Sequence, residues 1–219
     1  MSKIRKLLFP LSVVYDGVTR VKNFLYDNNL IHSHQFDIPL LIVGNLSVGG
    51  TGKTPHTEYI SNLIKSIRKT AVLSRGYDRK TTGYLLANSN SKPEDIGDEP
   101  LQIYRSVSNI NVAVSEDRST GISNLINDEN IESIVLDDAF QHRKIKGSLQ
   151  IIITTFQKPY YNDLLLPAGN LRESKSNQSR ADLIIVSKCP ENLSDTERAK
   201  IINTINTCFI YNLNDINFY

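Results

Sequence analysis

The segment Ser47-Val48-Gly49-Gly50-Thr51-Gly52-Lys53-Thr54 decides the fold of this chain. It follows the apolar run Leu40–Val43 and precedes a stretch with helical periodicity that begins at Pro55. A phosphate-binding loop occurs in this context of strand, loop and helix. The glycines allow successive backbone N–H groups to face an anion, and the positive end of the following helix points to the same place.

The residues of this segment predict different tasks in binding a triphosphate. We expect Lys53 to reach the β- and γ-phosphates and the Thr54 hydroxyl to bind Mg²⁺. Pro55 suits the first helical turn because its missing N–H has no intrahelical partner there. Ser47 stands where the consensus has Gly, but the glycines that follow and the intact Gly-Lys-Thr compensate for it. The alternative is a glycine-rich turn that binds no ligand.

A second motif offers carboxylates for the same metal ion. The largely apolar run Ser133–Leu136 is followed by Asp137 and Asp138. A carboxylate at the end of a strand often holds Mg²⁺, directly or through water. An apolar strand that ends in Asp is common, so the motif gains meaning only beside the phosphate loop. Together the two motifs predict that the chain binds a nucleoside triphosphate with Mg²⁺.

Short apolar runs and helical stretches alternate along the rest of the chain. Several runs are continuously apolar and β-branched, which is typical of strands buried on both faces of a parallel sheet. The expected strands are Leu40–Val43, Ala71–Leu73, Val112–Val114, Ser133–Leu136, Leu149–Ile153, Leu183–Val186 and Phe209–Tyr211. We expect helices at Thr57–Arg68 and Asp195–Asn206, and long loops at residues 77–98 and 154–180. This predicts an α/β fold of the P-loop NTPase-like kind, with a mostly parallel sheet flanked by helices.

Composition excludes several classes of protein. The 219 residues, 40% of them hydrophobic, suffice for one domain or two small ones and exclude a disordered chain. A formal net charge of +2 gives no electrostatic argument for nucleic-acid binding, and we expect no nucleic-acid partner. Two cysteines exclude a disulfide framework and a four-cysteine zinc site. No apolar run is long enough to span a membrane and no secretory signal is evident, so we expect the chain to stay in the cytoplasm.

The first 26 residues have the spacing of an amphipathic helix. Apolar residues recur every three or four positions from Ile4 to Leu25, and basic residues lie mostly outside that face. Such a helix can lie in the headgroup layer of an acidic membrane. It can equally pack its apolar face on the protein's own core, and the spacing alone leaves both alternatives open.

Several motifs, in the same order, resemble the tetraacyldisaccharide 4′-kinase (lipid A 4′-kinase) family. The resemblance runs from the N-terminal helix to about residue 211 and includes the phosphate loop. The other matching segments are Leu73–Tyr77, Gly97–Pro100, Val114–Arg118, Leu136–His142, Leu166–Glu173 and Ile185–Pro190. The family usually has Gly at the position of Asp78, and Asp tolerates the positive φ that a Gly there could serve.

The resemblance implies a specific reaction and location. The family uses ATP and Mg²⁺ to phosphorylate the 4′-hydroxyl of the lipid A disaccharide 1-phosphate precursor, at the cytoplasmic face of the bacterial inner membrane. It implies a peripheral or monotopic protein, with residues 1–38 as a membrane-surface helix and lead-in and residues 39–219 as the P-loop kinase nucleotide-binding domain. Family members are considerably longer, and their additional C-terminal lobe carries a catalytic His, so the activity of the short chain alone is in question.

The same resemblance suggests roles for residues outside the phosphate loop. Asp98 matches the family's proposed base for the acceptor hydroxyl, and Glu99 would assist the metal. Arg172 and Arg75 would bind phosphate through a bidentate guanidinium. The alternatives are a capping or turn carboxylate for Asp98 and solvated surface positions for both arginines.

Two other functions remain open at this stage. The chain could be a P-loop NTPase switch or binding module that hydrolyses nucleotide and changes conformation. It could also be a truncated kinase that binds ATP but is catalytically impaired. Transfer of phosphate from ATP into lipid, rather than into water, would separate the kinase from the switch.

Overall fold

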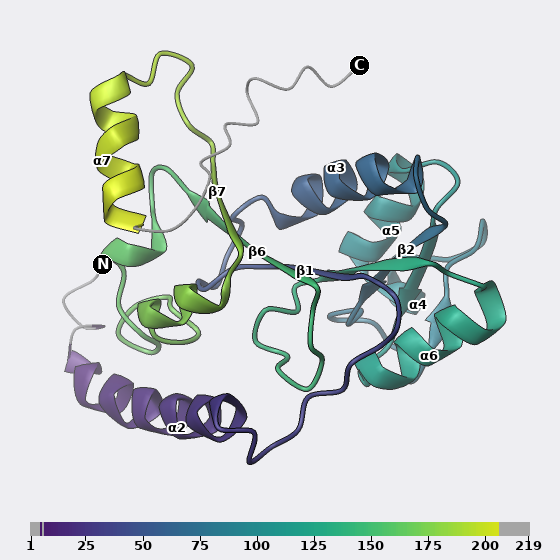
Figure 1. Cartoon of the computed structure of the whole chain (residues 1–219), viewed down its shortest axis with the longest axis horizontal. Coiled ribbons are helices and arrows are strands. Elements are labelled where there is room, and N and C mark those ends of the chain that lie inside the picture. The colour runs from purple at the N-terminus through teal and green to yellow at the C-terminus, as the bar shows by residue number, and fades with distance from the viewer. Residues whose placement is uncertain (1–4, 6, 206–219) are drawn as a thin grey trace. The chain divides into compact units, whose positions relative to one another are not determined.

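The computed structural model describes residue 5 and residues 7–205 of the chain (Figure 1). The chain divides into two compact units. Unit 1 contains the described residues up to His32, the segment Asn45–Gly52, and the described residues from Gln150 onward. Unit 2 contains Ser33–Gly44 and Lys53–Leu149. Each unit is described by itself below.

Unit 2 is built on five strands in the order β3-β4-β2-β5-β1. The strands are β1 (Leu40–Gly44), β2 (Thr70–Ser74), β3 (Leu85–Leu86), β4 (Asn111–Val114) and β5 (Ser133–Asp137). β4, β2, β5 and β1 are mutually parallel, and only the edge strand β3 is antiparallel. Every residue of β2 and β5 is buried, which explains why the middle of each strand reads as an apolar run without alternation.

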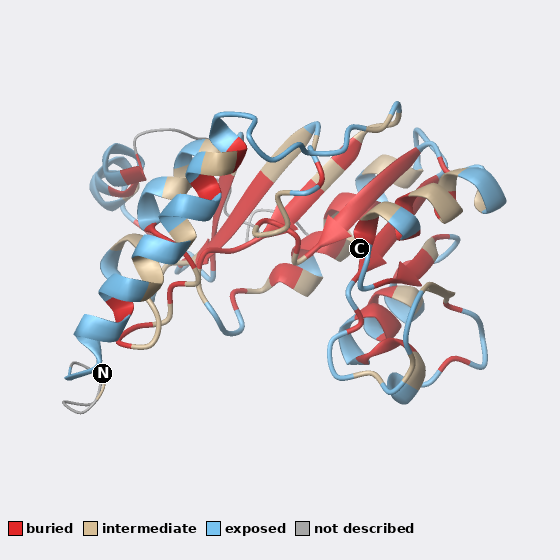
Figure 2. Cartoon of the chain, turned by 90° about the horizontal axis from the view of Figure 1, so that it is seen from below, coloured by how far each residue is buried: buried red, intermediate tan, exposed pale blue. Residues whose placement is uncertain are grey.

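Helices cover both faces of this sheet (Figure 1). α3 (Lys53–Lys65) and α5 (Asp98–Ser106) pack together on one face, and α6 (Arg118–Glu129) covers β2 and β4 on the other. The short α4 (Pro93–Ile96) leads directly into α5. Helices on both faces keep the central strands from water, and Figure 2 shows these strands as buried.

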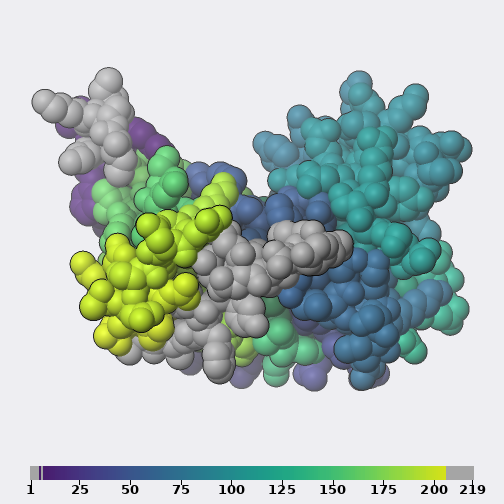
Figure 3. Space-filling view, turned by 90° about the horizontal axis from the view of Figure 1, so that it is seen from above, coloured from purple at the N-terminus to yellow at the C-terminus, as the bar shows by residue number. Residues whose placement is uncertain are grey.

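Unit 1 contains two parallel strands and several helical segments. Residues Ile151–Thr155 of β6 (Leu149–Thr155) pair in parallel with β7 (Leu183–Ser187). Between them lie the 3₁₀ helices η1 (Tyr160–Asn162) and η2 (Lys175–Arg180). After β7 comes α7 (Asp195–Ile205), which buries only Ile201 and Ile205 and is largely exposed in Figure 3, where it is yellow.

α2 (Phe9–Asp27) of unit 1 buries two polar residues and one tyrosine and leaves most of its apolar residues exposed. The buried residues are Ser12, Asn23 and Tyr26. Six apolar side chains of this helix are each 57% to 66% exposed: Leu11, Val13, Val14, Val18, Val21 and Phe24. Figure 2 shows most of α2 in the colour of exposed residues. The alternative in which the apolar face packs on the protein's own core is therefore not the arrangement of the described residues.

Most of the elements expected from the sequence are present. Six expected strands are confirmed with bounds that differ by at most two residues, whereas Phe209–Tyr211 lies outside the described residues. α3 begins four residues before the expected Thr57 because the helix already starts inside the phosphate loop. Asp78 has a φ of 62°, the positive value that its position suggested. Among the described residues, no helix has both the length and the apolar content needed to cross a membrane.

The sequence analysis missed five short or polar elements. α6 was not expected because its exposed face is polar and its buried residues are few. β3 and α4 fall inside the expected loop 77–98, and η1 and η2 fall inside the expected loop 154–180. Elements of two to six residues have too little periodicity to be recognised, so both loops are more ordered than the sequence indicated.

Candidate active site

Lys53, the first residue of α3, faces the two aspartates at the end of β5. Lys53 Nζ lies 3.7 Å from Asp138 Oδ1. The Thr57 hydroxyl, one turn further along α3, donates a hydrogen bond of 3.0 Å to Asp137 Oδ1. β5 is parallel to both of its neighbours, so its carboxyl end carries the aspartates to the side of the sheet where α3 begins. Unit 2 thus brings together the expected lysine and the expected metal carboxylates.

Asp137 is the most perturbed acid of this cluster. It is buried, and its oxygen Oδ2 has no hydrogen-bond partner among the described residues. Burial, followed by the negative charge of Asp138, raises the pKa of Asp137 to about 6, whereas the Thr57 hydrogen bond acts in the opposite direction. The charge of Glu99 also raises this pKa, so Glu99 is near enough to act on the same site. An unpartnered carboxylate oxygen beside a second carboxylate fits Mg²⁺, which prefers oxygen ligands and keeps several waters.

Asp98 and Glu99 form the first turn of α5. Gly97 ends α4 and precedes α5 with a φ of 92°, and a Cβ there would lie 2.9 Å from the carbonyl oxygen of Tyr77. Glycine therefore allows the two helices to meet and places Asp98 at the first helical position. Asp98 is exposed, caps no helix, and makes no side-chain hydrogen bond or ion pair within the described part of the chain. Its carboxylate is available to a substrate.

Arg118 is a residue of this cluster that the sequence analysis did not single out. It is 4% exposed, and its Nη1 donates a 2.9 Å hydrogen bond to the Ser115 carbonyl. Burial, followed by the positive charge of Arg75, lowers its pKa to about 10, while Asp137 and Asp138 act in the opposite direction. Arg118 belongs to one of the family-like segments, but only the structure shows that its guanidinium is buried near the acidic pair.

The first six residues of the phosphate loop, Ser47–Gly52, lie in unit 1. Gly49 and Gly52 have φ values of 108° and 87°, in the region that favours glycine. A Cβ on Gly49 or Gly50 would meet no atom within 4 Å, so this part of the loop is open. The chain continues through the peptide bond from Gly52 to Lys53 into α3.

Polar side chains of unit 1 hold this part of the loop. The Asn45 amide donates to the Thr51 hydroxyl at 2.9 Å. At the end of β7, the Ser187 hydroxyl donates to the Thr51 carbonyl at 2.8 Å, and Lys188 Nζ donates to the Gly50 carbonyl at 3.1 Å. Because these donors engage a hydroxyl and two carbonyl oxygens, they fix the path of the loop without using its N–H groups.

Arg172 lies in unit 1 and its backbone is tied to the start of the phosphate loop. Its N–H donates to the Leu46 carbonyl at 2.8 Å. Its own carbonyl accepts a 2.7 Å hydrogen bond from the Tyr15 hydroxyl of α2. Arg75 is exposed and belongs to unit 2. The two expected phosphate-binding arginines thus come from different units.

The fold and the lysine–aspartate cluster define a class of protein: an α/β nucleotide-binding protein with a P-loop NTPase-like fold. Comparison with known proteins narrows the class. Residues 4–215 match the family model described as tetraacyldisaccharide-1-P 4′-kinase, and the chain belongs to this family.

Relatives of known name and structure agree with this assignment. The chain is 46% identical over 203 residues to the tetraacyldisaccharide 4′-kinase of Flavobacterium johnsoniae and 49% identical over 202 residues to that of Flavobacterium psychrophilum. Each alignment covers 92% of this chain but 59% of the relative, so the chain spans about three-fifths of the length of these curated relatives. The crystal structure of the "apo" form of LpxK from Aquifex aeolicus in complex with ATP matches with a TM-score of 0.80 and 27% identity, covering 95% of this chain and 81% of the other.

Proposed function

We propose that this chain is the nucleotide-binding part of an ATP-dependent kinase that phosphorylates the 4′-hydroxyl of the lipid A disaccharide 1-phosphate precursor. The observation that carries the proposal is the contact of Lys53, a residue of the phosphate-loop sequence, with the aspartate pair Asp137 and Asp138 at the end of β5. Membership of the kinase family supports the choice of the lipid precursor as substrate, and the ATP complex of the Aquifex relative supports ATP as the nucleotide.

Phosphoryl transfer depends on positioning and on neutralising charge, and the residues of the cluster suit both tasks. We assign Ser47–Thr54 to the triphosphate, with Lys53 neutralising charge on the β- and γ-phosphates. Thr54, Asp137 and Asp138, assisted by Glu99, would hold Mg²⁺. Bound there, Mg²⁺ supplies positive charge to the phosphate oxygens.

We assign Asp98 to the acceptor and Arg172 to a phosphate group. The exposed carboxylate of Asp98 can accept a hydrogen bond from the sugar hydroxyl, orient it and take its proton as the new P–O bond forms. A carboxylate is a weak base towards an alcohol, so orientation is the larger part of this role. The guanidinium of Arg172 can bind phosphate oxygens through paired N–H groups.

The membrane surface is the second partner in this proposal. The exposed apolar side chains of α2 suit burial in the boundary between headgroups and acyl chains, at the cytoplasmic face of the inner membrane. A peripheral attachment of this kind would bring the kinase to a hydroxyl held at the interface. We therefore assign residues 1–38 to the membrane surface and residues 39–219 to nucleotide binding.

The experiment is transfer of ³²P from γ-labelled ATP into lipid that can be extracted with organic solvent. The wild-type chain is compared with Lys53→Ala and with Lys65→Ala, a control on the same helix whose ammonium contacts Ser108 instead. We expect labelled lipid from the wild type and Lys65→Ala and none from Lys53→Ala. Label found only as inorganic phosphate would favour the NTPase switch, and ATP binding without any transfer would favour an impaired kinase.

A further inference from the structure

A loop between β6 and β7 contacts both α2 and the first part of the phosphate loop, and all three belong to unit 1. We call residues 163–173 of this loop the strap. Its contacts on either side are hydrogen bonds to backbone groups or to buried and partly buried side chains. The strap is therefore a fixed connection between two parts of unit 1 to which the proposed function gives separate tasks.

On one side the strap forms a short ladder with the phosphate loop. The Val48 N–H donates to the Asn170 carbonyl at 2.8 Å, and the Arg172 N–H donates to the Leu46 carbonyl at 2.8 Å. Between these two bonds, Ser47 pairs with Leu171 in an antiparallel bridge. The start of the phosphate loop is thus held in register by the strap, in the way that one strand holds its neighbour.

On the other side α2 and the residues before it bind the strap. The Ser12 hydroxyl donates to the Leu165 carbonyl and accepts from the Ala168 N–H, both at 3.0 Å. The Tyr15 hydroxyl donates to the Arg172 carbonyl at 2.7 Å. Burial raises the pKa of Tyr15, so its hydroxyl remains a donor at neutral pH.

Arg5 adds a charged contact to the same loop. Its guanidinium donates to the carbonyl of Gly169 at 2.7 Å, to the carbonyl of Pro167 at 3.3 Å and to the Asn170 amide oxygen at 3.1 Å. Gly169 itself is tightly enclosed, because a Cβ there would lie 2.0 Å from the Leu164 carbonyl oxygen. The N-terminal segment therefore binds a strap that has little room to deform.

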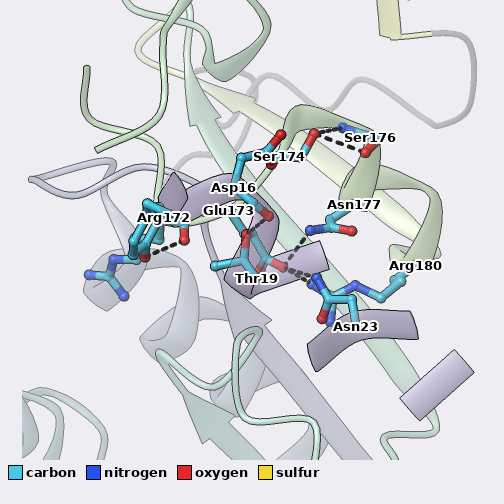
Figure 4. A network of polar contacts seen from close by, with 10 residues as sticks. Asp16, Thr19, Asn23, Arg172, Glu173, Ser174, Ser176, Asn177 and Arg180 are labelled. Atoms are coloured by element: carbon cyan, nitrogen blue, oxygen red, sulfur yellow. Dashed lines mark hydrogen bonds and ion pairs between the residues drawn. The ribbon is translucent and has the colours of Figure 1, made fainter. Parts of the chain in front are cut away.

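A buried carboxylate anchors the end of the strap. Glu173 is 4% exposed, and its Oε2 accepts hydrogen bonds from Asn23 of α2 at 3.4 Å, from Asn177 at 2.7 Å and from Arg180 at 2.6 Å (Figure 4). Figure 4 shows these side chains converging on Glu173 beside the backbone of Arg172. Partnered in this way, the buried charge fixes the strap to both α2 and η2.

We propose that Ser12 and Tyr15 are positioning residues that connect the lipid-facing helix α2 to the phosphate loop through the strap. Seating the apolar face of α2 on a lipid surface restricts its motion, the strap transmits this restriction to Leu46–Val48, and ATP then binds a loop that is already ordered. Ordering shared by two ligands makes each favour the other, and this coupling is reciprocal. The inference rests on the proposed function, since it requires that the phosphate loop binds ATP.

The test measures the affinity for MgATP by calorimetry, with and without vesicles of equal parts phosphatidylcholine and phosphatidylglycerol. For the wild type we expect vesicles to tighten ATP binding by about fivefold, the lower end of typical coupling between two sites. In Tyr15→Phe and Ser12→Ala this ratio should fall to about one while vesicle binding itself is retained. The control is Thr19→Ala, which removes a hydroxyl that donates to the carbonyl of Asp16 in its own helix, and it should keep the wild-type ratio.

The outcomes separate this inference from the function on which it rests. If the wild type binds ATP equally well with and without vesicles, or if Tyr15→Phe keeps the wild-type ratio, the coupling is overturned and the nucleotide site stands. If the wild type binds no ATP under either condition, the proposed function fails and the inference fails with it. Tyr15→Phe retains the ring and the helix, so it remains informative if Ser12→Ala does not fold.

Discussion

At the scale of single residues, Asp137 shows how burial prepares a metal site. Its pKa of about 6 comes from loss of water and from the neighbouring charge of Asp138, and one of its oxygens lacks a hydrogen-bond partner within the described part of the chain. A cation bound there would offset the repulsion between the two carboxylates and would also give the unpartnered oxygen a ligand. The proposed Mg²⁺ site therefore costs the chain stability until it is filled, a common feature of functional sites.

The raised pKa of Asp137 predicts a pH dependence of Mg²⁺ binding. Because Mg²⁺ needs the ionised carboxylate, its affinity should fall as the pH decreases below about 6, by up to tenfold per pH unit. Without metal, the stability of the folded chain depends on pH in the opposite direction. Between pH 3.8 and about 6 the folded state keeps a proton on Asp137 that the unfolded state has already released, so the free energy of unfolding decreases as the pH rises through this range. Mg²⁺ titration of the nucleotide complex at several pH values measures the first effect.

The matched variants for this experiment are Asp137→Asn and Asp128→Asn. The first should remove the pH dependence together with most of the Mg²⁺ affinity. The second changes an exposed carboxylate on α6 and should behave as the wild type. A wild-type pH profile in Asp137→Asn would assign the effect to another group.

Asp98 should affect the rate and not the binding of nucleotide. Asp98→Asn removes the proposed base, and we expect turnover to fall by about 10²- to 10⁴-fold while the Kd for ATP changes little. Single-turnover transfer and calorimetry measure the two quantities. Glu94→Gln, an exposed change in the neighbouring α4, is the control. If turnover and the affinity for ATP fell equally, Asp98 would instead be assigned to the metal site.

At the scale of elements, α2 differs from an ordinary surface helix because two of its three buried residues are polar. Ser12 and Asn23 bond the strap, Asn23 through Glu173, so the helix is held by specific hydrogen bonds while most of its apolar residues remain in contact with water. Each exposed Val or Leu forgoes about 1.5 to 3 kcal/mol of burial energy, which a lipid surface could supply. The same pattern would be a liability in a protein without a partner for this face.

Charges on the apolar face of α2 should weaken lipid binding without unfolding the chain. In Val14→Asp with Val18→Asp, two positions that are each 66% exposed, we expect the free energy of unfolding to change by less than about 1 kcal/mol. Binding to the vesicles described above should weaken by at least about tenfold, measured by co-sedimentation. The control is Ile67→Asp, an 81% exposed apolar residue after α3. Unchanged sedimentation of the double variant would exclude α2 as the lipid-binding element.

At the scale of the whole molecule, the chain forms unit 1 from segments that are far apart in sequence. Arg5 bonds Gly169, which is 164 residues away, and Tyr15 bonds Arg172 across 157 residues. Closing such long loops costs entropy that only the finished set of contacts repays. Unit 1 therefore depends on contacts between the N-terminal segment and the strap, and it contains the first part of the phosphate loop.

Nucleotide binding should stabilise the folded chain as a whole. MgATP at about one hundred times its Kd should raise the free energy of unfolding by about 2.7 kcal/mol, because only the folded state binds it. Thermal unfolding with and without MgATP measures the shift. In Lys53→Ala the shift should disappear, whereas Lys65→Ala should retain it, and a wild-type shift in Lys53→Ala would place the nucleotide elsewhere.

The sequence by itself determined the features that depend on neighbouring residues. Unbroken apolar runs located β2 and β5, the glycine pattern located the phosphate loop, and Asp137 was expected at a strand end because strand and carboxylate are adjacent. These signals are local: periodicity and turn chemistry act within a few residues of one another. The tertiary structure alone decided the hydrogen bond from Thr57 to Asp137, the burial of Arg118, and the burial of the polar residues Ser12 and Asn23 on α2. Each of these depends on which distant segment removes water from a side chain, and no local pattern encodes that neighbour.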